Sequence, residues 1–260
     1  MFVRLARRWL PVLFLPVLFL LLGALAATPA LAQGGAAGSF TAQQRQEIVD
    51  IVREALRSDA SLLRDAITAL QEDEARQKMA AAEGAIVGNA QALTRTPGDP
   101  VAGNPDGDVT VVEFYDVRCP YCRRMVPVIA ELIRSDPKVR VVYKDFPILG
   151  PASVTAARAL LAAHKQGGYV KMHNVLMTGA PNLDEAALRA ATQRAGLDWP
   201  RLQRDMDAPD VQARINANLA LGRALDIQGT PAYVIGDQLV PGAVGLGDLK
   251  GAVAAVRRGQ

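Results

Sequence analysis

The chain contains very little cysteine: among its 260 residues only Cys119 and Cys122 carry a thiol. A protein stabilised by a framework of disulfides carries several cysteines. A bridge between two residues so close in sequence closes too small a loop to stabilise a fold much. The pair is therefore better explained by chemical reactivity than by cross-linking, and any thiol chemistry of this chain must occur there.

Histidine is also scarce, since only His164 and His173 are present. A structural zinc site needs about four ligands, mostly Cys and His, and two cysteines with two distant histidines do not favour one. The sequence shows no Ser/His/Asp set and no phosphate-binding loop. We therefore expect no metal site, and we interpret both histidines as structural or surface residues.

An excess of one charge is absent once the N-terminus is set aside. The chain has 29 Lys and Arg against 26 Asp and Glu. Three of the arginines lie in residues 1–32, which contain no acid, so 26 residues of each sign remain. A nucleic-acid-binding domain is expected to carry a basic excess. We therefore expect no nucleic-acid partner.

The first 32 residues have the three-part plan of a secretory signal peptide. A basic segment is followed by an apolar run and then by small residues suited to cleavage; these parts are Arg4 to Arg8, Leu10 to Ala27 and Ala30-Leu31-Ala32. We predict a signal peptide over residues 1–32 and a periplasmic or otherwise exported mature protein. The alternative is an uncleaved anchor, because about 18 apolar residues are long enough to span a bilayer.

Two segments precede the main domain. Residues 33–40 are rich in glycine and are predicted to be a flexible lead. Residues 41–93 have apolar residues at helical spacing and are predicted to form two helices. The first begins at Thr41, with Gln44 completing a capping box, and the second follows Asp59. Such a pair cannot bury two apolar stripes by itself, so it must pack on the main domain or on other copies of itself.

The remainder of the chain is predicted to be a linker and one larger domain. Residues 94–108 are rich in proline, glycine and aspartate, which is typical of a linker. Residues 109–260 show strands at 109–115 and 139–143, a helix from 119 to about 133, a helical block over about 151–224, a hairpin within 230–241 and a helix from 246 to 256. This order predicts an α/β thioredoxin fold with a helical insertion, preceded by an N-terminal helical segment.

Cys119 stands where a strand gives way to a helix. Pro120 suits the first helical position, where its missing N–H costs nothing. With Cys119 as the N-cap, the free N–H groups of Tyr121 and Cys122 and the helix dipole face its sulfur and stabilise a thiolate. Cys122 lies one turn further on and is expected to be less exposed. We predict that Cys119 attacks or is attacked, and that Cys122 resolves the mixed disulfide.

Glu113 is an acid inside an apolar strand, shortly before Cys119. By strand alternation its side chain points to the opposite face from Val112 and Phe114. One interpretation is a carboxyl buried under the cysteine pair, with a raised pKa, that accepts the proton of Cys122. The other is an ordinary acid on a solvated face, and spacing alone leaves both open.

Three segments in this order resemble the DsbA-like thioredoxin-fold proteins, and within them the Com and ScsC type of branch. They are Glu113–Cys122, Tyr143–Gly150 and Gln228–Gly236. The likeness covers about residues 100–258. Residues 59–70 also resemble the amino-terminal helical region of that branch, which oligomerises some ScsC-type members.

The resemblance implies a role for each residue of the site. Cys119 would be the exposed nucleophile and Cys122 its buried partner, with Glu113 as the family's buried acid. An X–Pro bond is trans by default, but the resemblance implies a cis Pro231 that faces the disulfide. It also implies that the backbone of Thr230 pairs with substrate peptide as an added strand.

Two further residues follow from the same resemblance. Lys144 would be a charged neighbour of Glu113. The dipeptide Pro120-Tyr121, which faces substrate, lacks the histidine that helps stabilise the thiolate in the best-known oxidase of the family. The dithiol here is therefore expected to be less oxidising.

These features lead to an expected function and two rivals. We expect an exported thiol–disulfide oxidoreductase that uses only its Cys119–Cys122 disulfide, without any cofactor. Its partners would be cysteine-containing exported proteins and a membrane redox protein that resets the dithiol. The enzymatic alternative is a disulfide isomerase or reductase that forms homo-oligomers through residues 41–85. The non-enzymatic alternative is a copper-binding or chaperone-like protein that uses the dithiol as a ligand.

Overall fold

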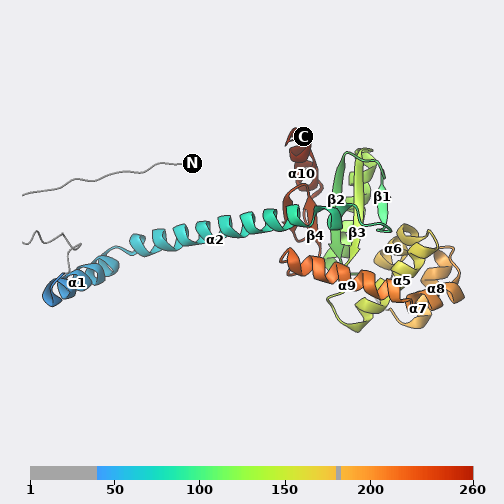
Figure 1. Ribbon diagram of the computed structural model, residues 1–260, viewed down its shortest axis with the longest axis horizontal. Helices are drawn as coiled ribbons and strands as arrows, with labels where there is room; N and C mark the ends of the chain where they lie inside the picture. The colour runs from blue at the N-terminus through green and yellow to red at the C-terminus, as the bar shows by residue number, and fades with distance from the viewer. Residues whose placement is uncertain (1–39, 180–182, 260) are drawn as a thin grey trace, which may run out of the picture. The chain divides into compact units, whose positions relative to one another are not determined.

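The computed structural model describes residues 40–179 and 183–259 of the chain (Figure 1). The chain divides into two units, residues 1–63 and residues 64–260. The predicted signal peptide and nearly all of the predicted flexible lead lie outside the described residues. Over the part that is described, none of the helices combines the length and the apolar character needed to cross a membrane.

The first unit contains helix α1 (Ala42–Ser58) and the start of α2 (Ala60–Gly88). The predicted capping box is confirmed: the hydroxyl of Thr41 accepts from the backbone N–H of Gln44 at 3.2 Å, and the Gln44 side chain accepts from the Thr41 N–H at 2.9 Å. Asp59 separates the two helices, as predicted, and accepts from the backbone N–H of Ser61 at 2.8 Å. No residue of α1 is buried.

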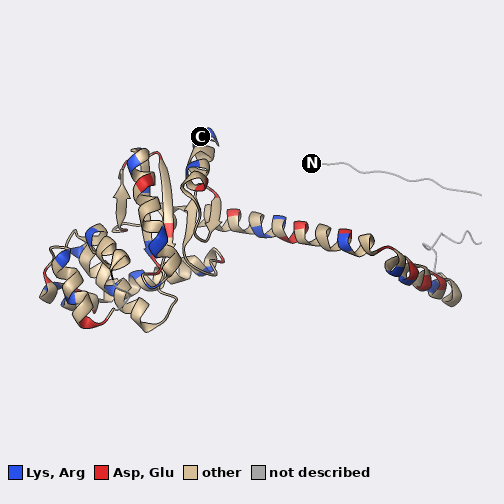
Figure 2. Cartoon of the chain, turned by 180° about the vertical axis from the view of Figure 1, so that it is seen from behind, with Lys and Arg blue, Asp and Glu red and all other residues tan. Residues whose placement is uncertain are grey.

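Helix α2 continues to Gly88, and a short helix α3 (Ala90–Thr94) follows. Acidic and basic residues interleave along α2, as Figure 2 shows. At the end of this region Ile86 and Leu93 are buried in the second unit, in a cluster with residues of its sheet.

The second unit is built on a five-stranded sheet with the strand order β1-β3-β2-β4-β5. Strands β2 and β3 are parallel, and the other neighbours are antiparallel. The strands are β1 (Val101–Gly103), β2 (Val109–Tyr115), β3 (Val139–Asp145), β4 (Ala232–Ile235) and β5 (Gln238–Pro241). The predicted hairpin is confirmed, since β4 and β5 are joined by the two residues Gly236 and Asp237.

One strand lies where the sequence predicted only a linker. Residues 101–103 pair with β3 in antiparallel register, with Ala102 opposite Val141. The prediction of a linker over residues 94–108 is therefore wrong at β1. The local signals of Pro100 and Gly103 favour a loop, but the exposed edge of β3 supplies hydrogen-bond partners that override them.

Alternation along β2 sends its side chains into two separate cores. Val111 and Tyr115 pack with helices α4 (Pro120–Ser135) and α10 (Leu246–Gly259) on one face. Val112 and Phe114 pack on the other face with Leu93 and with the end of α9 (Pro209–Ala224). Glu113 shares the face of Val111, so it points towards the side of the sheet that α4 covers.

The predicted helical insertion is confirmed as five helices between β3 and β4 (Figure 1). They are α5 (Pro151–Lys165), α6 (Tyr169–Thr178), α7 (Glu185–Arg194), α8 (Trp199–Met206) and α9 (Pro209–Ala224). Trp199 is buried at the start of α8, where Asp198 is the N-cap. Because α6 packs on α4, the insertion supports the helix that begins at the cysteine motif.

Candidate active site

Cys119 is the N-cap of α4, as the sequence predicted. Its backbone is extended (φ −71°, ψ 118°), and Pro120 takes the first helical position. The backbone N–H of Cys119 donates to the carbonyl of Asp116 at 3.0 Å, which closes the turn between β2 and α4. The thiol of Cys119 donates to the carbonyl oxygen of Thr230, with 3.2 Å between the Sγ and the oxygen.

The two thiols are free in this structure and differ less in exposure than expected. Cys119 is 4% exposed and Cys122 is fully buried. The expectation of an exposed Cys119 is therefore wrong in degree, because the Thr230 carbonyl lies against its sulfur. Burial raises the pKa of the Cys122 thiol far above its ordinary value. Tyr121, by contrast, is 53% exposed, and Pro120 is exposed too, so this dipeptide is the accessible part of the motif.

Pro231 follows Thr230 through a cis peptide bond, as the resemblance implied. The loop that holds this bond lies directly before β4, which pairs with β2. The carbonyl of Pro231 accepts from the backbone N–H of Gly242 at 2.8 Å, so the hairpin β4–β5 fixes the position of the loop. The structure thus brings the two distant segments, 119–122 and 230–231, into contact.

Glu113 is buried, with 3% exposure. Of the two interpretations that its spacing left open, the acid on a solvated face is therefore wrong and the buried carboxyl is correct. It pairs across the sheet with Tyr143 on one side and Tyr233 on the other. The hydroxyl of Tyr233 donates to Glu113 Oε1 at 3.1 Å. Burial raises the pKa of the Glu113 carboxyl to about 7, although the hydrogen bond from Tyr233 opposes this rise.

A cavity of about 270 Å³ reaches Glu113 from the side of α4. Its lining includes Tyr143, His173, Val126 and Ile129. His173 is itself buried, and burial lowers its pKa to about 4. The ring of His173 packs against Tyr143 with 4.7 Å between the ring centroids, which fits the structural role that the sequence suggested.

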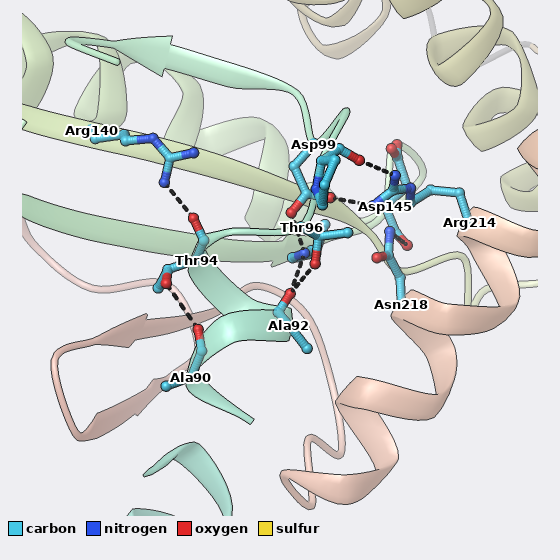
Figure 3. A network of polar contacts seen from close by, with 11 residues as sticks. Ala90, Ala92, Thr94, Thr96, Asp99, Arg140, Asp145, Arg214 and Asn218 are labelled. Carbon is cyan, nitrogen blue, oxygen red and sulfur yellow. Dashed lines mark hydrogen bonds and ion pairs between the residues drawn. The ribbon is translucent and has the colours of Figure 1, made fainter. Parts of the chain in front are cut away.

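Lys144 does not join this group, so the expectation that it neighbours Glu113 is wrong. It lies opposite Phe114 in the parallel register, and its side chain is on the other face of the sheet. There its Nζ donates to Asp99 Oδ2 at 2.5 Å and to the carbonyl of Ala92 at 2.8 Å. Arg214 of α9 donates to the other oxygen of Asp99 at 2.8 Å, and Figure 3 shows this pair.

The polar network in Figure 3 connects residues 92–99 to strand β3 and helix α9. Besides the contacts of Asp99, Arg140 of β3 donates to the carbonyl of Thr94 at 2.7 Å. Arg214 also donates to the carbonyl of Pro97 at 2.6 Å. Lys144 therefore has a structural position and no contact with the cysteines.

Two buried acids next to the site were not identified from the sequence. Asp116 accepts from the backbone N–H groups of Arg118, Ile148 and Leu149 at 2.8 to 3.0 Å, and thereby joins the turn before Cys119 to the loop after β3. An Asp at the end of a strand can accept from the backbone N–H two residues later, so its position is a signal in the sequence for this kind of turn.

The second acid, Asp145, accepts from the hydroxyls of Tyr115 at 3.0 Å and Tyr169 at 2.9 Å. Burial raises the pKa of Asp145 to about 7. Because Tyr169 belongs to α6, this network connects the insertion to the ends of β2 and β3. Within the described residues, no three His, Cys, Asp or Glu side chains are grouped so that they could hold a metal ion.

Comparison with known proteins identifies the family of this arrangement. Residues 110–254 match the model of the DSBA-like thioredoxin domain. A thioredoxin-like oxidoreductase from Silicibacter pomeroyi is 46% identical, with a TM-score of 0.63 over 65% of this chain and 97% of that one. ScsC from Proteus mirabilis is 32% identical, with a TM-score of 0.61 over 84% of this chain and 96% of that one.

Curated relatives include the thiol:disulfide interchange protein DsbA from Bordetella parapertussis, 26% identical over 60% of this chain and 78% of that protein. They also include sodium/proton antiporters, of whose length this chain spans only about a quarter. The matched residues make up more than half of the chain, and they include the cysteine motif, the buried Glu113 and the cis Pro231. The chain belongs to the DsbA-like thioredoxin-domain family.

Proposed function

We propose that this chain is an exported thiol–disulfide oxidoreductase that exchanges disulfides with cysteines of other exported proteins. The observation that carries the proposal is the position of Cys119 at the start of α4, with its thiol 3.2 Å from the Thr230 carbonyl next to cis Pro231. A sulfur at a helix N-terminus is stabilised as a thiolate. The adjacent carbonyl is a backbone acceptor that an incoming peptide strand would use.

The proposed reaction begins from the Cys119–Cys122 disulfide and a substrate with two thiols. A substrate thiolate attacks the sulfur of Cys119, forming a mixed disulfide and releasing Cys122 as a thiolate. The second substrate thiolate then attacks the substrate sulfur of the mixed disulfide and releases the Cys119 thiolate. Two electrons pass from the substrate to the cysteine pair. Of the two protons that the substrate thiols lose, one is taken up by Cys122 and the other by solvent.

Glu113 is proposed as the proton donor and acceptor for Cys122. The released Cys122 thiolate is buried, and burial strongly favours its neutral form. A carboxyl whose pKa is about 7 is present in both protonation states near neutral pH, so it can donate to Cys122 and accept from it. The cavity beside Glu113 is the route by which we propose that its proton reaches solvent.

The proposed cellular setting comes from the N-terminal segment. Residues 1–32 have the plan of a signal peptide, so we propose export followed by cleavage near Ala32. An exported dithiol must be reset after each turnover, and we propose a membrane redox protein as the partner that does so.

The test is to capture the mixed disulfide. Cys122→Ser, with Cys119 activated by a small aromatic disulfide, is expected to bind a cysteine-containing unfolded protein covalently, because no resolving thiol remains. The wild-type protein treated in the same way should release its client, and dithiothreitol should release it from the variant. The adduct is measured by mass spectrometry of intact protein. Absence of a dithiothreitol-sensitive adduct at Cys119 would sink the proposal.

A second candidate, an oligomeric isomerase or reductase, is favoured by the apolar surface of α1 and the first half of α2. Large apolar side chains there are 40–68% exposed; they include Ile48, Ile51, Val52, Leu63 and Ile67. Large apolar side chains left exposed along a helix are typical of an association site. We propose that a second copy of the same helices covers it, so that several catalytic domains act on one client.

Light scattering of residues 33–260 tests this candidate. The expected result is a mass of two or more copies at micromolar concentration, falling towards one copy when Ile51→Gln and Ile67→Gln are combined. The matched control is Arg53→Gln with Arg64→Gln, which changes exposed residues of the same helices without removing apolar surface. A monomeric wild-type protein would remove the isomerase candidate and leave a simple disulfide donor.

A further inference from the structure

Arginine bounds the cysteine motif on both sides. Arg118 precedes Cys119, and Arg123 and Arg124 follow Cys122. Among the described residues, none of these three arginines has a carboxylate within 4.0 Å. The residues outside the description, 1–39, 180–182 and 260, contain no Asp or Glu. The three positive charges that flank the cysteine motif in the sequence therefore have no acidic side chain within 4.0 Å.

Arg123 holds its charge in a fixed place. Its Nε donates to the carbonyl of Val117 at 3.0 Å, and its Nη1 donates to the carbonyls of Met177 at 3.2 Å and Gly179 at 2.8 Å. All three acceptors are neutral. Burial, with no opposing acid, lowers the pKa of the Arg123 guanidinium, which agrees with a charge that the protein does not neutralise.

Arg118 and Arg124 bring the same charge to the surface. Both are exposed. The guanidinium of Arg124 lies 4.4 Å from the centroid of the Tyr121 ring, so it stands beside the exposed dipeptide of the motif. Arg118 donates to the carbonyl of Leu149, on the loop after β3. One guanidinium group thus lies beside the dipeptide of the motif, and the other extends from the residue directly before Cys119.

The acids of this region do not offset that charge at the surface. Asp116 is 2% exposed, and its oxygens accept from three backbone N–H groups. Glu113 is buried and, with a pKa of about 7, is only partly ionised at neutral pH. Asp226 is exposed, but it belongs to the segment before cis Pro231 and not to the cysteine motif; its Oδ1 accepts from the side chain of Gln228. Within the cysteine motif and the residues that flank it, the exposed charges are those of Arg118 and Arg124, and both are positive.

We infer that Arg118 and Arg124 select protein substrates whose reactive cysteine is flanked by Asp or Glu. The inference rests on the proposed thiol–disulfide exchange and names the substrate class of that same site. Guanidinium groups bind carboxylates through paired hydrogen bonds. A carboxylate on each side of the substrate cysteine would meet one arginine each, while a lysine at either position would be repelled.

The expected preference is moderate, because both arginines are solvent-exposed. One exposed ion pair changes a binding constant by roughly twofold to fivefold, so two of them give a preference of about tenfold between Glu and Lys. Charges on a surface are screened when the ionic strength rises, since the Debye length falls from about 30 Å at 0.01 M to about 3 Å at 1 M. The preference should therefore nearly vanish at high salt.

The experiment uses three dithiol peptides that differ only in the residues flanking the first cysteine, which are Glu, Gln or Lys. The oxidised full mature protein is mixed with each, and the rate constant of oxidation is measured at low and at high salt. Each rate constant is divided by the rate constant for the reaction of the same peptide with a neutral small-molecule disulfide. This division removes the effect of the flanking charge on the reactivity of the peptide thiol itself. The expected corrected ratio of Glu to Lys is about tenfold at low salt.

Variants assign the preference to the two arginines. Arg118→Gln with Arg124→Gln should bring the corrected ratio close to one, and Arg118→Glu with Arg124→Glu should invert it. The matched control, Arg204→Gln with Arg258→Gln, removes the same charge from exposed positions on α8 and α10 and should keep the wild-type ratio.

The outcomes separate the inference from the proposed function. A wild-type ratio near one, or a ratio that the Gln pair leaves unchanged, overturns the inference while oxidation of the Gln peptide still supports the function. Failure of the wild-type protein to oxidise any of the three peptides overturns the proposed function, and the inference with it.

Discussion

An Asp99→Asn variant is expected to lose about 3–5 kcal/mol of its free energy of unfolding, as is usual when one partner of a buried ion pair is removed. The side chains of Asp99 and Lys144 are each 2% exposed in their ion pair. Asparagine has nearly the same shape, so the change removes the charge and little packing. Arg214 is partly exposed and can turn to solvent, but the ammonium group of Lys144 stays buried without a counter-charge. The measurement is chemical denaturation at neutral pH.

Two further variants show whether the unpaired charge is the cause. Asp99→Asn combined with Lys144→Met should recover most of the lost free energy of unfolding, because two uncharged side chains replace the unpaired ammonium group. Glu131→Gln breaks an ion pair with Arg134 on the surface of α4, where pairs contribute about 1 kcal/mol or less. A double variant no more stable than Asp99→Asn alone would contradict this account of the network.

A Glu113→Gln variant is expected to be about 3 kcal/mol more stable than the wild-type protein at pH 8 and only about 1 kcal/mol more stable at pH 5. Burial places the pKa of Glu113 at about 7 in the folded state, against an ordinary value of 4.5. Each tenfold difference in proton affinity corresponds to about 1.4 kcal/mol. Between these two pKa values the folded protein binds more protons than the unfolded chain, so the free energy of unfolding falls as the pH rises.

Glutamine mimics the protonated acid and does not titrate. The free energy of unfolding of the variant therefore lacks the contribution of Glu113 to its decrease between pH 4.5 and pH 7. Denaturation curves at several pH values in that range measure it, with the dithiol kept reduced. The control is Glu131→Gln, an exposed acid on α4, which should retain the wild-type slope. Asp145, with a similarly raised pKa, contributes its own part of the slope in every variant. Equal slopes for Glu113→Gln and the wild-type protein would show that Glu113 is not the buried titrating acid.

The sequence was sufficient where one local rule decided the outcome. A cysteine followed by proline at the start of an amphipathic helix placed Cys119 at the N-cap. Strand alternation placed Glu113 on the face opposite to Phe114. The cis bond before Pro231 needed the family resemblance, because X–Pro bonds are trans by default.

The sequence was insufficient where strand pairing decided the outcome. The register between β2 and β3 places Tyr143 beside Glu113 and Lys144 opposite Phe114. A shift of one residue exchanges the two faces, and nothing in the sequence fixes the register of parallel strands joined by a helix. The burial of Cys119 likewise depends on the carbonyl of Thr230, which is far from it in the chain.

Both outer strands of the sheet are short. Strand β1 has three residues and ends at Gly103, whose φ is +73°, and β5 has four residues and ends at Pro241. An unpaired strand edge is a template on which another chain adds its own strand, and natural proteins suppress this by keeping edges short or by placing proline there. The unfolded client used to test the proposed function would expose extended segments of this kind. The short edges therefore limit the incorporation of this protein into the aggregates that such chains form.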